Sequence, residues 1–432
     1  MLHDKDDPKP YIVSVCAGSN QISLITEAKN LGYNVIGIDQ NIDAPGLRFC
    51  DIIIQESILN YNSIYKKLRK MPINIVGVIT RSYGAAVITT AFLAEKFKIP
   101  YIGRKKLNHF YDKTKLKETF SKLSIKSPGV RASTNSKLGV RAFINNLTKT
   151  GVRASFPIVI KPTQGHAKKG VMKIESNAEL AKYFDEYTNT KEKFLIEEYI
   201  NGQEIICVGL VILGKFNLIE ITDKVTSPPP AFIDILHTAP SVYEYKKSEI
   251  TTIGQKLADH FKIINSPIIM EFIVDSNNEL YIIEAVPEFG GEYLCDILIP
   301  LRYNYNIFKE FIKAQTGEQT ELPNFNSDSD AAAIKYITGQ GSEPPNKQKI
   351  LDYYNSKSVC KIPEIKYFKM FIELGQKVNE PKSNHDRIGV IVSQANSLEK
   401  ALSSIKLAEK CLALNIGSEP NTNGSDPKLK VK

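Results

Sequence analysis

The stretch from Pro267 to Glu292 carries two glutamates in apolar runs on either side of a short polar turn. The runs are rich in Ile, Val, Phe and Tyr and flank Asp275-Ser276-Asn277-Asn278, a pattern typical of a β-hairpin. A two-residue turn centred on the asparagines makes Glu271 face Glu284. Like charges directly opposite each other destabilise a sheet, and a divalent cation with oxygen ligands offsets that repulsion. The pattern indicates either a magnesium site shared with phosphates or a solvated hairpin with two harmless glutamates.

A lysine ends the apolar run of residues 157–162. Lys161 is followed by the loop Thr163–Gly170, which contains glycines and basic residues, and then by a strand-like segment over Val171–Ile174. An unpaired lysine on an apolar strand is costly, and a glycine-containing loop between strands can donate backbone N–H groups to phosphates. The pattern favours a phosphate-binding loop over a flexible, exposed hairpin. His166 in this loop could contact a phosphate or be an exposed loop histidine.

Three glutamates flank the turn at Asn201-Gly202. They are Glu197 and Glu198 at the end of one predicted strand and Glu204 at the start of the next. In a nucleotide site, the first strand could present backbone groups to adenine, and the Glu204 carboxylate could accept the ribose hydroxyls. Residues 222–240 read as a long proline-rich loop, and such loops are often functional. His237 within it is a weak candidate for a substrate contact.

Residues 107–123 form a basic stretch with a helical pattern. It carries Lys113, Lys115, Lys117 and Lys122. Such a run is usually a solvated helix face, although one of its lysines could reach a phosphate.

The elements that would position these residues begin with alternating strand-like and helix-like segments over residues 11–105. Strands are expected at 11–16, 34–38, 51–55, 73–80 and 99–102, and helices before residue 31 and over 85–97. This alternation predicts βαβ units and a parallel sheet. The turn after the first strand, CAGSNQ, lacks the Gly-x-Gly-x-x-Gly pattern, which argues against dinucleotide binding. The turn is better explained by an N-capping Ser19 or Asn20, or by amides that bind a substrate anion.

The composition is that of an ordinary globular protein. The 432 residues are 42% apolar and 24% charged, which suggests two to four domains with a full core. The formal charge of +9 is spread along the chain, so nucleic-acid binding is not expected. No run approaches 18 apolar residues, so no membrane partner is expected. Six scattered cysteines without a CxxC pair indicate a reduced, cytoplasmic protein. A strand at 331–338, a strand at 387–393 and a helix over 397–415 predict a small C-terminal α/β domain, and residues 416–432 a disordered tail.

The order of these parts resembles the ATP-grasp superfamily over about residues 11–415. Tyr111-Asp112-Lys113 looks like the Asp-Lys that precedes the ATP-grasp fold, and Phe156–Pro162 looks like its second lysine strand. Glu197–Ile200 resembles the adenine-contacting hinge, and Gly202-Gln203-Glu204 resembles the ribose-binding Gly-x-Glu. Met270-Glu271-Phe272 and Ile283-Glu284 resemble the two metal glutamates.

The resemblance implies a set of site residues. Lys161, Glu284 and Arg302 would be catalytic. The residues expected to bind the nucleotide are Lys113, Lys161, His166, Lys169, Glu197, Glu198, Ile200 and Glu204. The residues expected to bind Mg²⁺ or Mn²⁺ are Glu271, Glu284 and Glu288.

The sequence departs from the family pattern after the second metal strand. Val286-Pro287-Glu288 stands where relatives usually have Asn-Pro-Arg, and Ala167-Lys168 replaces the Gly-Ser of the phosphate loop. Glu288 could supply an oxygen to a metal or recognise a cationic group, and Lys168 or Lys169 could offset the missing arginine. These changes leave room for unusual substrate choice or for weakened catalysis.

The resemblance implies an α/β and α+β fold: a pre-ATP-grasp domain at 1–105, an ATP-grasp domain at 106–325 and a C-terminal lid domain at 326–415. It implies an ATP-dependent ligase that activates a small-molecule carboxylate as an acylphosphate for attack by an amine. The alternatives are a bicarbonate-activating carboxylase and a nucleotide-binding protein without turnover. Homodimers are common among relatives.

Overall fold

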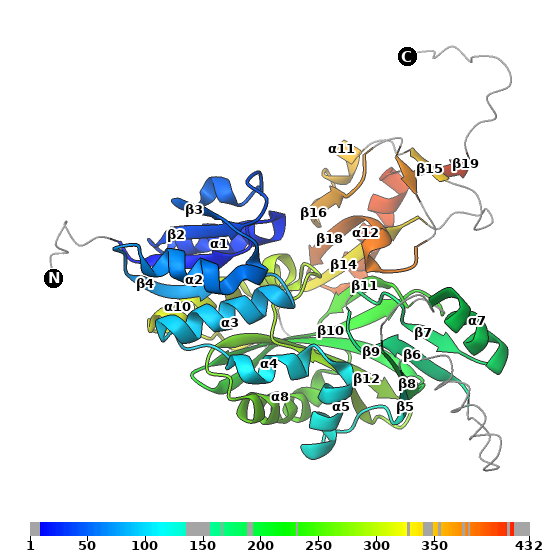
Figure 1. The fold of residues 1–432 in the computed structure, drawn as a ribbon. Helices are drawn as coiled ribbons and strands as arrows, with labels where there is room; N and C mark the ends of the chain where they lie inside the picture. The colour runs from blue at the N-terminus through cyan, green and yellow to red at the C-terminus, as the bar shows by residue number, and fades with distance from the viewer. Residues whose placement is uncertain are drawn as a thin grey trace.

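The N-terminal layer is a four-stranded parallel sheet in the order β3-β2-β1-β4 (Figure 1). In the computed structural model, the residues described are 9–134, 156–165, 167–187, 193–229, 232–325, 329–339, 349–352, 356–373, 376–378, 381–412 and 415–418. The strands are β1 (Tyr11–Val15), β2 (Asn34–Asp39), β3 (Ile52–Gln55) and β4 (Ile75–Ile79). The helices α1 (Ile22–Asn30), α2 (Tyr61–Arg69) and α3 (Ala85–Phe97) follow β1, β3 and β4. The predicted parallel α/β layer is confirmed.

The centre of the molecule is an eight-stranded antiparallel sheet in the order β13-β12-β9-β10-β11-β14-β18-β16. Its strands are β9 (Gly202–Ile212), β10 (Lys215–Thr226), β11 (Asp234–Ala239), β12 (Ser266–Asp275), β13 (Leu280–Val286), β14 (Ala331–Thr338), β16 (Ile365–Met370) and β18 (Arg387–Ala395). Helix α8 (Lys247–Phe261) packs on β10 and α12 (Leu398–Leu412) packs on β18. One sheet therefore runs from the predicted metal hairpin to the C-terminal region (Figure 1).

Two smaller sheets flank this one. The first has the order β5-β8-β6-β7 and consists of β5 (Val130–Thr134), β6 (Ile158–Pro162), β7 (Met172–Ile174) and β8 (Phe194–Glu198). Helix α7 (Asn177–Tyr187) shares a hydrophobic core with it. The second has the order β17-β15-β19 and consists of β15 (Lys349–Asp352), β17 (Lys377–Val378) and β19 (Asn415–Ser418). Because β19 pairs with β15, the predicted tail begins inside a strand; residues 419–432 lie outside the described residues.

The remaining helices connect these layers. They are α4 (Arg104–Phe110), α5 (Lys113–Lys122), α9 (Ile299–Tyr303), α10 (Ile307–Thr316) and α11 (Ser356–Val359), with a π-helix, η5 (Leu294–Leu298). Short 3₁₀ helices are η1 (Ser19–Gln21), η2 (Leu47–Phe49), η3 (Ile58–Asn60), η4 (Glu244–Lys246) and η6 (Asn384–Asp386).

The largest buried cluster joins the N-terminal sheet to the central sheet. It extends from Ile12 to Val392 and includes Ile307 and Phe311 of α10. Gln315 at the end of α10 accepts a hydrogen bond from the Val78 backbone N–H in β4, with 3.2 Å between the atoms. In Figure 1, α10 lies among the N-terminal elements although it is distant in sequence. The division at residues 105 and 325 remains a prediction, but this helix links the first two predicted domains.

The hairpin at residues 266–286 corrects the predicted register. Strands β12 and β13 are joined by a three-residue turn with Asn278 at φ 63°, so Val274 rather than Asp275 faces Leu280. The pairing of β12 with β13 then has a bulge between Glu271 and Phe272, which shifts the register by one residue. The two differences cancel, and Glu271 faces Glu284 as predicted.

Three further expectations change. The single helix over 107–123 is two helices, because Asp112 caps α5: its Oδ1 accepts from the N–H groups of Thr114 and Lys115 at 3.0 and 3.3 Å. Residues 99–102 contribute one β-bridge, from Ile102 to Ile263, instead of a strand. Much of the predicted loop at 222–240 lies in β10 and β11.

Candidate active site

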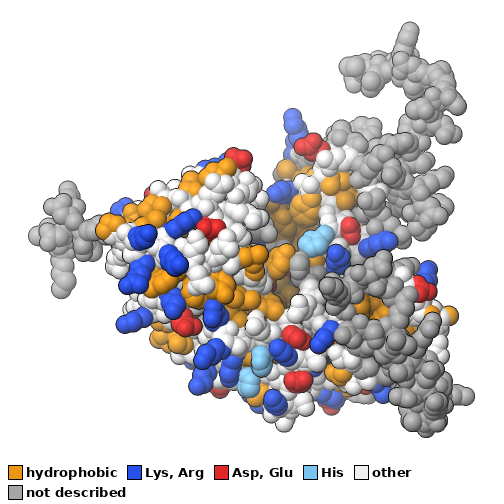
Figure 2. Space-filling model, in the orientation of Figure 1, with side chains coloured by type: hydrophobic (Ala, Val, Ile, Leu, Met, Phe, Trp, Pro, Cys, Tyr) orange, Lys and Arg blue, Asp and Glu red, His pale blue; other side chains and the backbone are white. Residues whose placement is uncertain are grey.

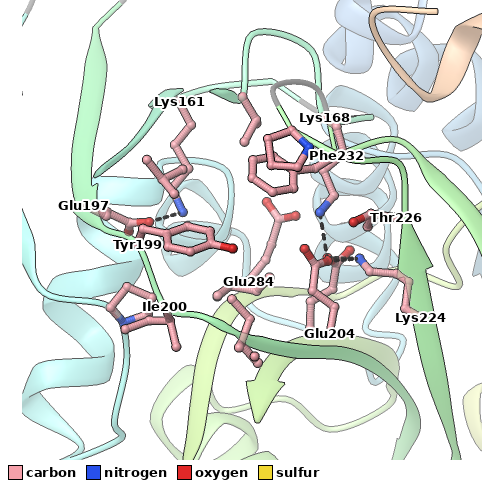
Figure 3. A pocket seen from close by; sticks show the side chains of 18 of the residues that line it. Lys161, Lys168, Glu197, Tyr199, Ile200, Glu204, Lys224, Thr226, Phe232 and Glu284 are labelled. Carbon is pink, nitrogen blue, oxygen red and sulfur yellow. Dashed lines mark hydrogen bonds and ion pairs between the residues drawn. The ribbon is translucent and has the colours of Figure 1, made fainter. Parts of the chain in front are cut away.

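A cavity of about 400 Å³ lies between the β5-β8-β6-β7 sheet and the edge of the central sheet. The predicted residues that line it are Lys113, Lys161, Glu197, Glu198, Ile200, Glu204, Glu271 and Glu284. Apolar side chains form part of its wall, and Figure 3 shows Tyr199 and Phe232 directed into it from different sides. A cavity with an apolar wall and a few converging charged groups is the usual form of a small-molecule site.

Glu197 lies between two lysines at one side of the cavity. Its Oε2 is 2.5 Å from Lys161 Nζ, and its Oε1 is 2.9 Å from Lys117 Nζ (Figure 3 shows the Lys161 pair). All three side chains are buried. Burial alone would raise the pKa of Glu197, but Lys161 and Lys117 hold it below its usual range. Burial lowers the pKa of Lys117 to about 8. The carboxylate therefore holds Lys161 at the end of β6, in the manner expected for a charged strand residue.

A second charged group crosses the other side of the cavity. Glu204 Oε2 is 3.0 Å from Lys168 Nζ and 2.9 Å from Lys224 Nζ, as the dashed lines in Figure 3 mark. Lys224 is fully buried on β10 and also lies 3.4 Å from Asp234 Oδ1 and 2.6 Å from Glu271 Oε2. Burial opposes ionisation of Glu204, yet the two lysines lower its pKa to about 2. The three carboxylates around Lys224 keep the pKa of that ammonium well above its usual value.

The two opposed glutamates occupy different electrostatic surroundings. Burial and the neighbouring carboxylates raise the pKa of Glu271, although Lys224 opposes this. Burial acts on Glu284 too, but Lys113, whose Nζ is 3.0 Å from Glu284 Oε1, lowers its pKa. Opposite pKa shifts of this kind are typical of two carboxylates that share one site.

Helix α5 supplies Lys113 as its first residue. The Lys113 Nζ also donates to the Gly165 carbonyl at 3.1 Å, and the Lys113 N–H donates to the Thr163 carbonyl at 2.9 Å. The helix start is thus fixed to the phosphate-loop candidate by backbone and side chain together. Glu198 is held in the wall of the cavity by the Gly129 N–H, at 2.8 Å from its Oε1.

Two predicted site residues lie away from the cavity. Arg302 is buried, with its Nε 2.6 Å from Glu220 Oε2 and its Nη1 2.7 Å from the Asp330 carbonyl. A catalytic role does not fit a guanidinium committed to a buried carboxylate. Glu288 accepts from the Gly84 N–H at 3.3 Å and bonds Tyr111, and burial raises its pKa to about 7. A metal-ligand role does not fit this carboxyl either, because it is turned toward the N-terminal layer.

The other predictions divide between surface and buried positions. Lys169 is exposed, and His166 lies outside the described residues. His237 is fully buried and lies 3.6 Å from Glu292, which forms a two-point ion pair with Arg387 at 2.6 and 3.0 Å. Lys168, named as a possible substitute for the missing arginine, lines the cavity.

Lys224, Tyr199 and Phe232 also line the cavity but were not named individually from the sequence, although Tyr199 lies in the predicted adenine-contacting segment and the other two in the predicted loop at 222–240. Lys224 stands in Thr222-Asp223-Lys224-Val225-Thr226, a largely polar stretch, so no burial cost marks it in the sequence. No side-chain pattern marks the two aromatic residues.

Residues 154–296 match the model of the ATP-grasp domain. The chain contains an ATP-grasp domain. The match covers β6–β13, which carry Lys161 and the two opposed glutamates, whereas Lys113 precedes it.

One curated protein and several solved structures are similar to the chain at low sequence identity. Formate-dependent phosphoribosylglycinamide formyltransferase from Prochlorococcus marinus is 24% identical over 177 residues, which are 40% of this chain and 43% of that protein. The chain thus spans less than half of that curated relative. The solved L-amino acid ligase from Bacillus licheniformis superposes with a TM-score of 0.77 at 18% identity, covering 96% of this chain and 100% of the other. The N5-carboxyaminoimidazole synthetase from Staphylococcus aureus complexed with ADP gives 0.71 at 18%, covering 93% and 98%.

The residues of the ATP-grasp cavity fit a nucleotide and one divalent cation. Its volume, its apolar wall and its lysines suit a purine, a ribose and phosphates. Within the described ranges, no group of three His, Cys, Asp or Glu side chains forms a complete metal cage. Mg²⁺ commonly takes one or two carboxylates from the protein and oxygens from substrate phosphates, and Glu271 and Glu284 offer that pair. The two carboxylates repel each other, and a bound cation would relieve that repulsion.

Proposed function

We propose that this chain is an ATP-dependent ligase that activates a small-molecule carboxylate and joins it to an amine. The observation that carries the proposal is the opposed pair Glu271 and Glu284 with Lys113 and Lys161 around one cavity. The ATP-grasp match and the three relatives, one of which is solved with ADP, support ATP as the nucleotide.

Each residue has a defined task in this proposal. Lys113 and Lys161 hold the phosphates, Glu204 accepts the ribose hydroxyls, and the Glu197–Ile200 segment contacts adenine. Glu271 and Glu284 would hold Mg²⁺, which neutralises charge on the phosphate oxygens when bound. A carboxylate oxygen of the substrate attacks the γ-phosphorus, and ADP leaves. An amine then attacks the acyl carbon, and inorganic phosphate leaves. Both steps depend on positioning and charge neutralisation.

The test is the release of ADP and phosphate from MgATP across a panel of amino acids and other small carboxylates, with and without amine acceptors. Release that requires one carboxylate and one amine is the expected result. Release with bicarbonate alone would identify a carboxylase instead. Nucleotide binding with no release under any condition would indicate a protein that binds without turnover.

Two variants tie this activity to the cavity. Glu284→Gln and Lys161→Ala should each lower turnover by roughly 100-fold or more, because each removes a charge aimed at the reacting phosphates. Glu279→Gln is the matched control, since Glu279 lies on the same hairpin, is half exposed and pairs with Lys126 outside the cavity. Unchanged turnover in both cavity variants would overturn the site assignment.

A further inference from the structure

The backbone of Ala167 and Lys168 requires outside support. Gly165, Ala167, Lys168 and Gly170 have φ values of 130°, 57°, 62° and 72°. The left-handed region disfavours residues with a Cβ, so the Ala167-Lys168 pair is held there by its surroundings rather than by its own preference.

The support for these two residues comes from the far C-terminal part of the chain. The Asn384 N–H, at the start of η6, donates to the Ala167 carbonyl at 3.1 Å. The Lys168 carbonyl accepts from the Val171 N–H within the loop, also at 3.1 Å. Asn384 thus joins the backbone of the left-handed pair to the C-terminal region.

The side chain of Asn384 is committed at the same time. Its Nδ2 donates to Asp234 Oδ2 at 2.6 Å, and its Oδ1 accepts from the Asp234 N–H at 3.0 Å. Asn384 and Asp234 are both buried. The Asn384 carbonyl accepts from Arg387 Nε at 2.8 Å, so its backbone is fixed from the other side as well. A residue bound at its N–H, its carbonyl and its whole amide has one position.

That position determines where Lys168 carries its charge. Lys168 Nζ lies 3.0 Å from Glu204 Oε2 and 4.0 Å from Oδ1 of Asp234, the residue to which the Asn384 amide is hydrogen-bonded. Figure 3 shows the Lys168 side chain entering the cavity beside Glu204. The strands β14 and β18 connect this C-terminal region to the sheet that forms one side of the cavity. Figure 2 shows a hollow lined by hydrophobic side chains between the C-terminal region and the N-terminal layer.

We propose that Asn384 is a positioning residue for nucleotide binding: it fixes the Ala167-Lys168 backbone and Asp234 so that the Lys168 ammonium is presented to the nucleotide phosphates. The inference rests on the proposed function, since it assumes that the cavity takes a nucleotide. It assigns to the C-terminal region a direct part in the phosphate-binding loop.

The first experiment measures the positioning itself by amide hydrogen exchange with mass spectrometry. Asn384→Ala should speed the exchange of peptides that cover Ala167–Val171 by about tenfold or more. The matched control is Asn265→Ala. Asn265 is also buried and also uses both ends of its amide: it accepts from the Leu213 N–H and donates to the Ala314 and Pro100 carbonyls, but it lies outside the cavity wall. Equal exchange of the loop in the two variants would overturn the proposal.

The second experiment asks whether Asn384 acts through Lys168. MgADP is titrated calorimetrically into the wild type, Asn384→Ala, Lys168→Met and the double variant. Each single change should weaken binding about tenfold, and the double variant should bind no more weakly than Lys168→Met alone. Losses that multiply would overturn the proposal. If the wild type binds no MgADP, the proposed function fails, while the exchange experiment still decides whether Asn384 positions the loop.

Discussion

At the scale of single residues, the cavity is a set of lysines and carboxylates that neutralise one another. Lys224 is the centre of one such group, with Glu204, Asp234 and Glu271 within 3.4 Å of its Nζ. Removing one partner from a buried ion pair is far more destabilising than replacing the whole pair, because it leaves uncompensated charge. Lys224 is therefore expected to stabilise the empty protein as well as to face the phosphates.

Lys224→Met should lower the free energy of unfolding at pH 7 by about 3 kcal/mol. The pKa of Glu204 is lowered to about 2 in the folded protein, so its favourable contribution is present above the ordinary value of 4.5 and is lost as the pH falls toward 2. In the variant, the carboxylates take up protons more readily. The difference in unfolding free energy between the wild type and Lys224→Met should therefore shrink as the pH falls. Urea unfolding at pH 7 and pH 4 measures it.

The control for this prediction is Lys215→Met, at an exposed position on the same strand. It should change stability by less than about 0.5 kcal/mol at either pH. A deficit for Lys224→Met that is equal at both pH values would contradict the electrostatic explanation.

The sequence predicted the placement of some site residues and not of others, for a physical reason. Burial cost singles out Lys161 in its apolar strand, but it does not mark Lys224, whose neighbours Asp223 and Thr226 are polar. The positions of Glu288 and Arg302 were not accessible in this way, because their partners, Gly84 and Glu220, are distant in sequence. A side chain's direction depends on which distant element packs against it.

At the scale of elements, the site depends on where helices begin and strands pair. The helix over 85–97 and the strand over 331–338 were predicted with the bounds that the structure has, since each is a long apolar segment with clear ends. The hairpin prediction placed Glu271 opposite Glu284 correctly despite a wrong turn length, because a bulge cancels the error. Bulges have no strong sequence signal, so such a register can be predicted only in part.

The start of α5 provides a test at this scale. Asp112→Ala should cost about 1 kcal/mol of stability, because the Thr114 and Lys115 N–H groups lose their acceptor. It should also raise the KM for ATP several-fold, since Lys113 is the next residue and a shifted helix start displaces its ammonium.

Asp112→Asn is the informative comparison, because asparagine caps helices about as well as aspartate. It should retain most of the stability and most of the ATP affinity. Thermal unfolding and the KM for ATP are measured on both variants. A KM that rises equally in both would mean that the carboxylate charge, rather than the cap, is what matters.

At the scale of the whole molecule, the layers are less independent than the sequence pattern suggests. The predicted domain boundaries at 105 and 325 divide the chain into separate units, but α10 packs on β4 and shares its core. Across the described residues, no helix is long and apolar enough to span a membrane, and all six cysteines are free.

A fragment of residues 9–105 should therefore lack a cooperative unfolding transition. Without α10, the face of β4 that Gln315 and its neighbours cover would be open to water, and a core this small has little stability to lose. Urea titration followed by circular dichroism is the measurement, with the intact chain as reference. A sharp two-state transition in the fragment would show that α10 is dispensable to this layer.

The position of α10 also bears on how the chain is made. More than 200 residues separate β4 from this helix, and ribosomes add about 5–20 residues per second, so roughly 10–50 s pass between the synthesis of the two. During that time the N-terminal sheet has four strands but not the helix that covers one side of β4. The nascent chain must carry this apolar surface until α10 has left the ribosome, so the N-terminal layer and the central sheet reach their final packing together.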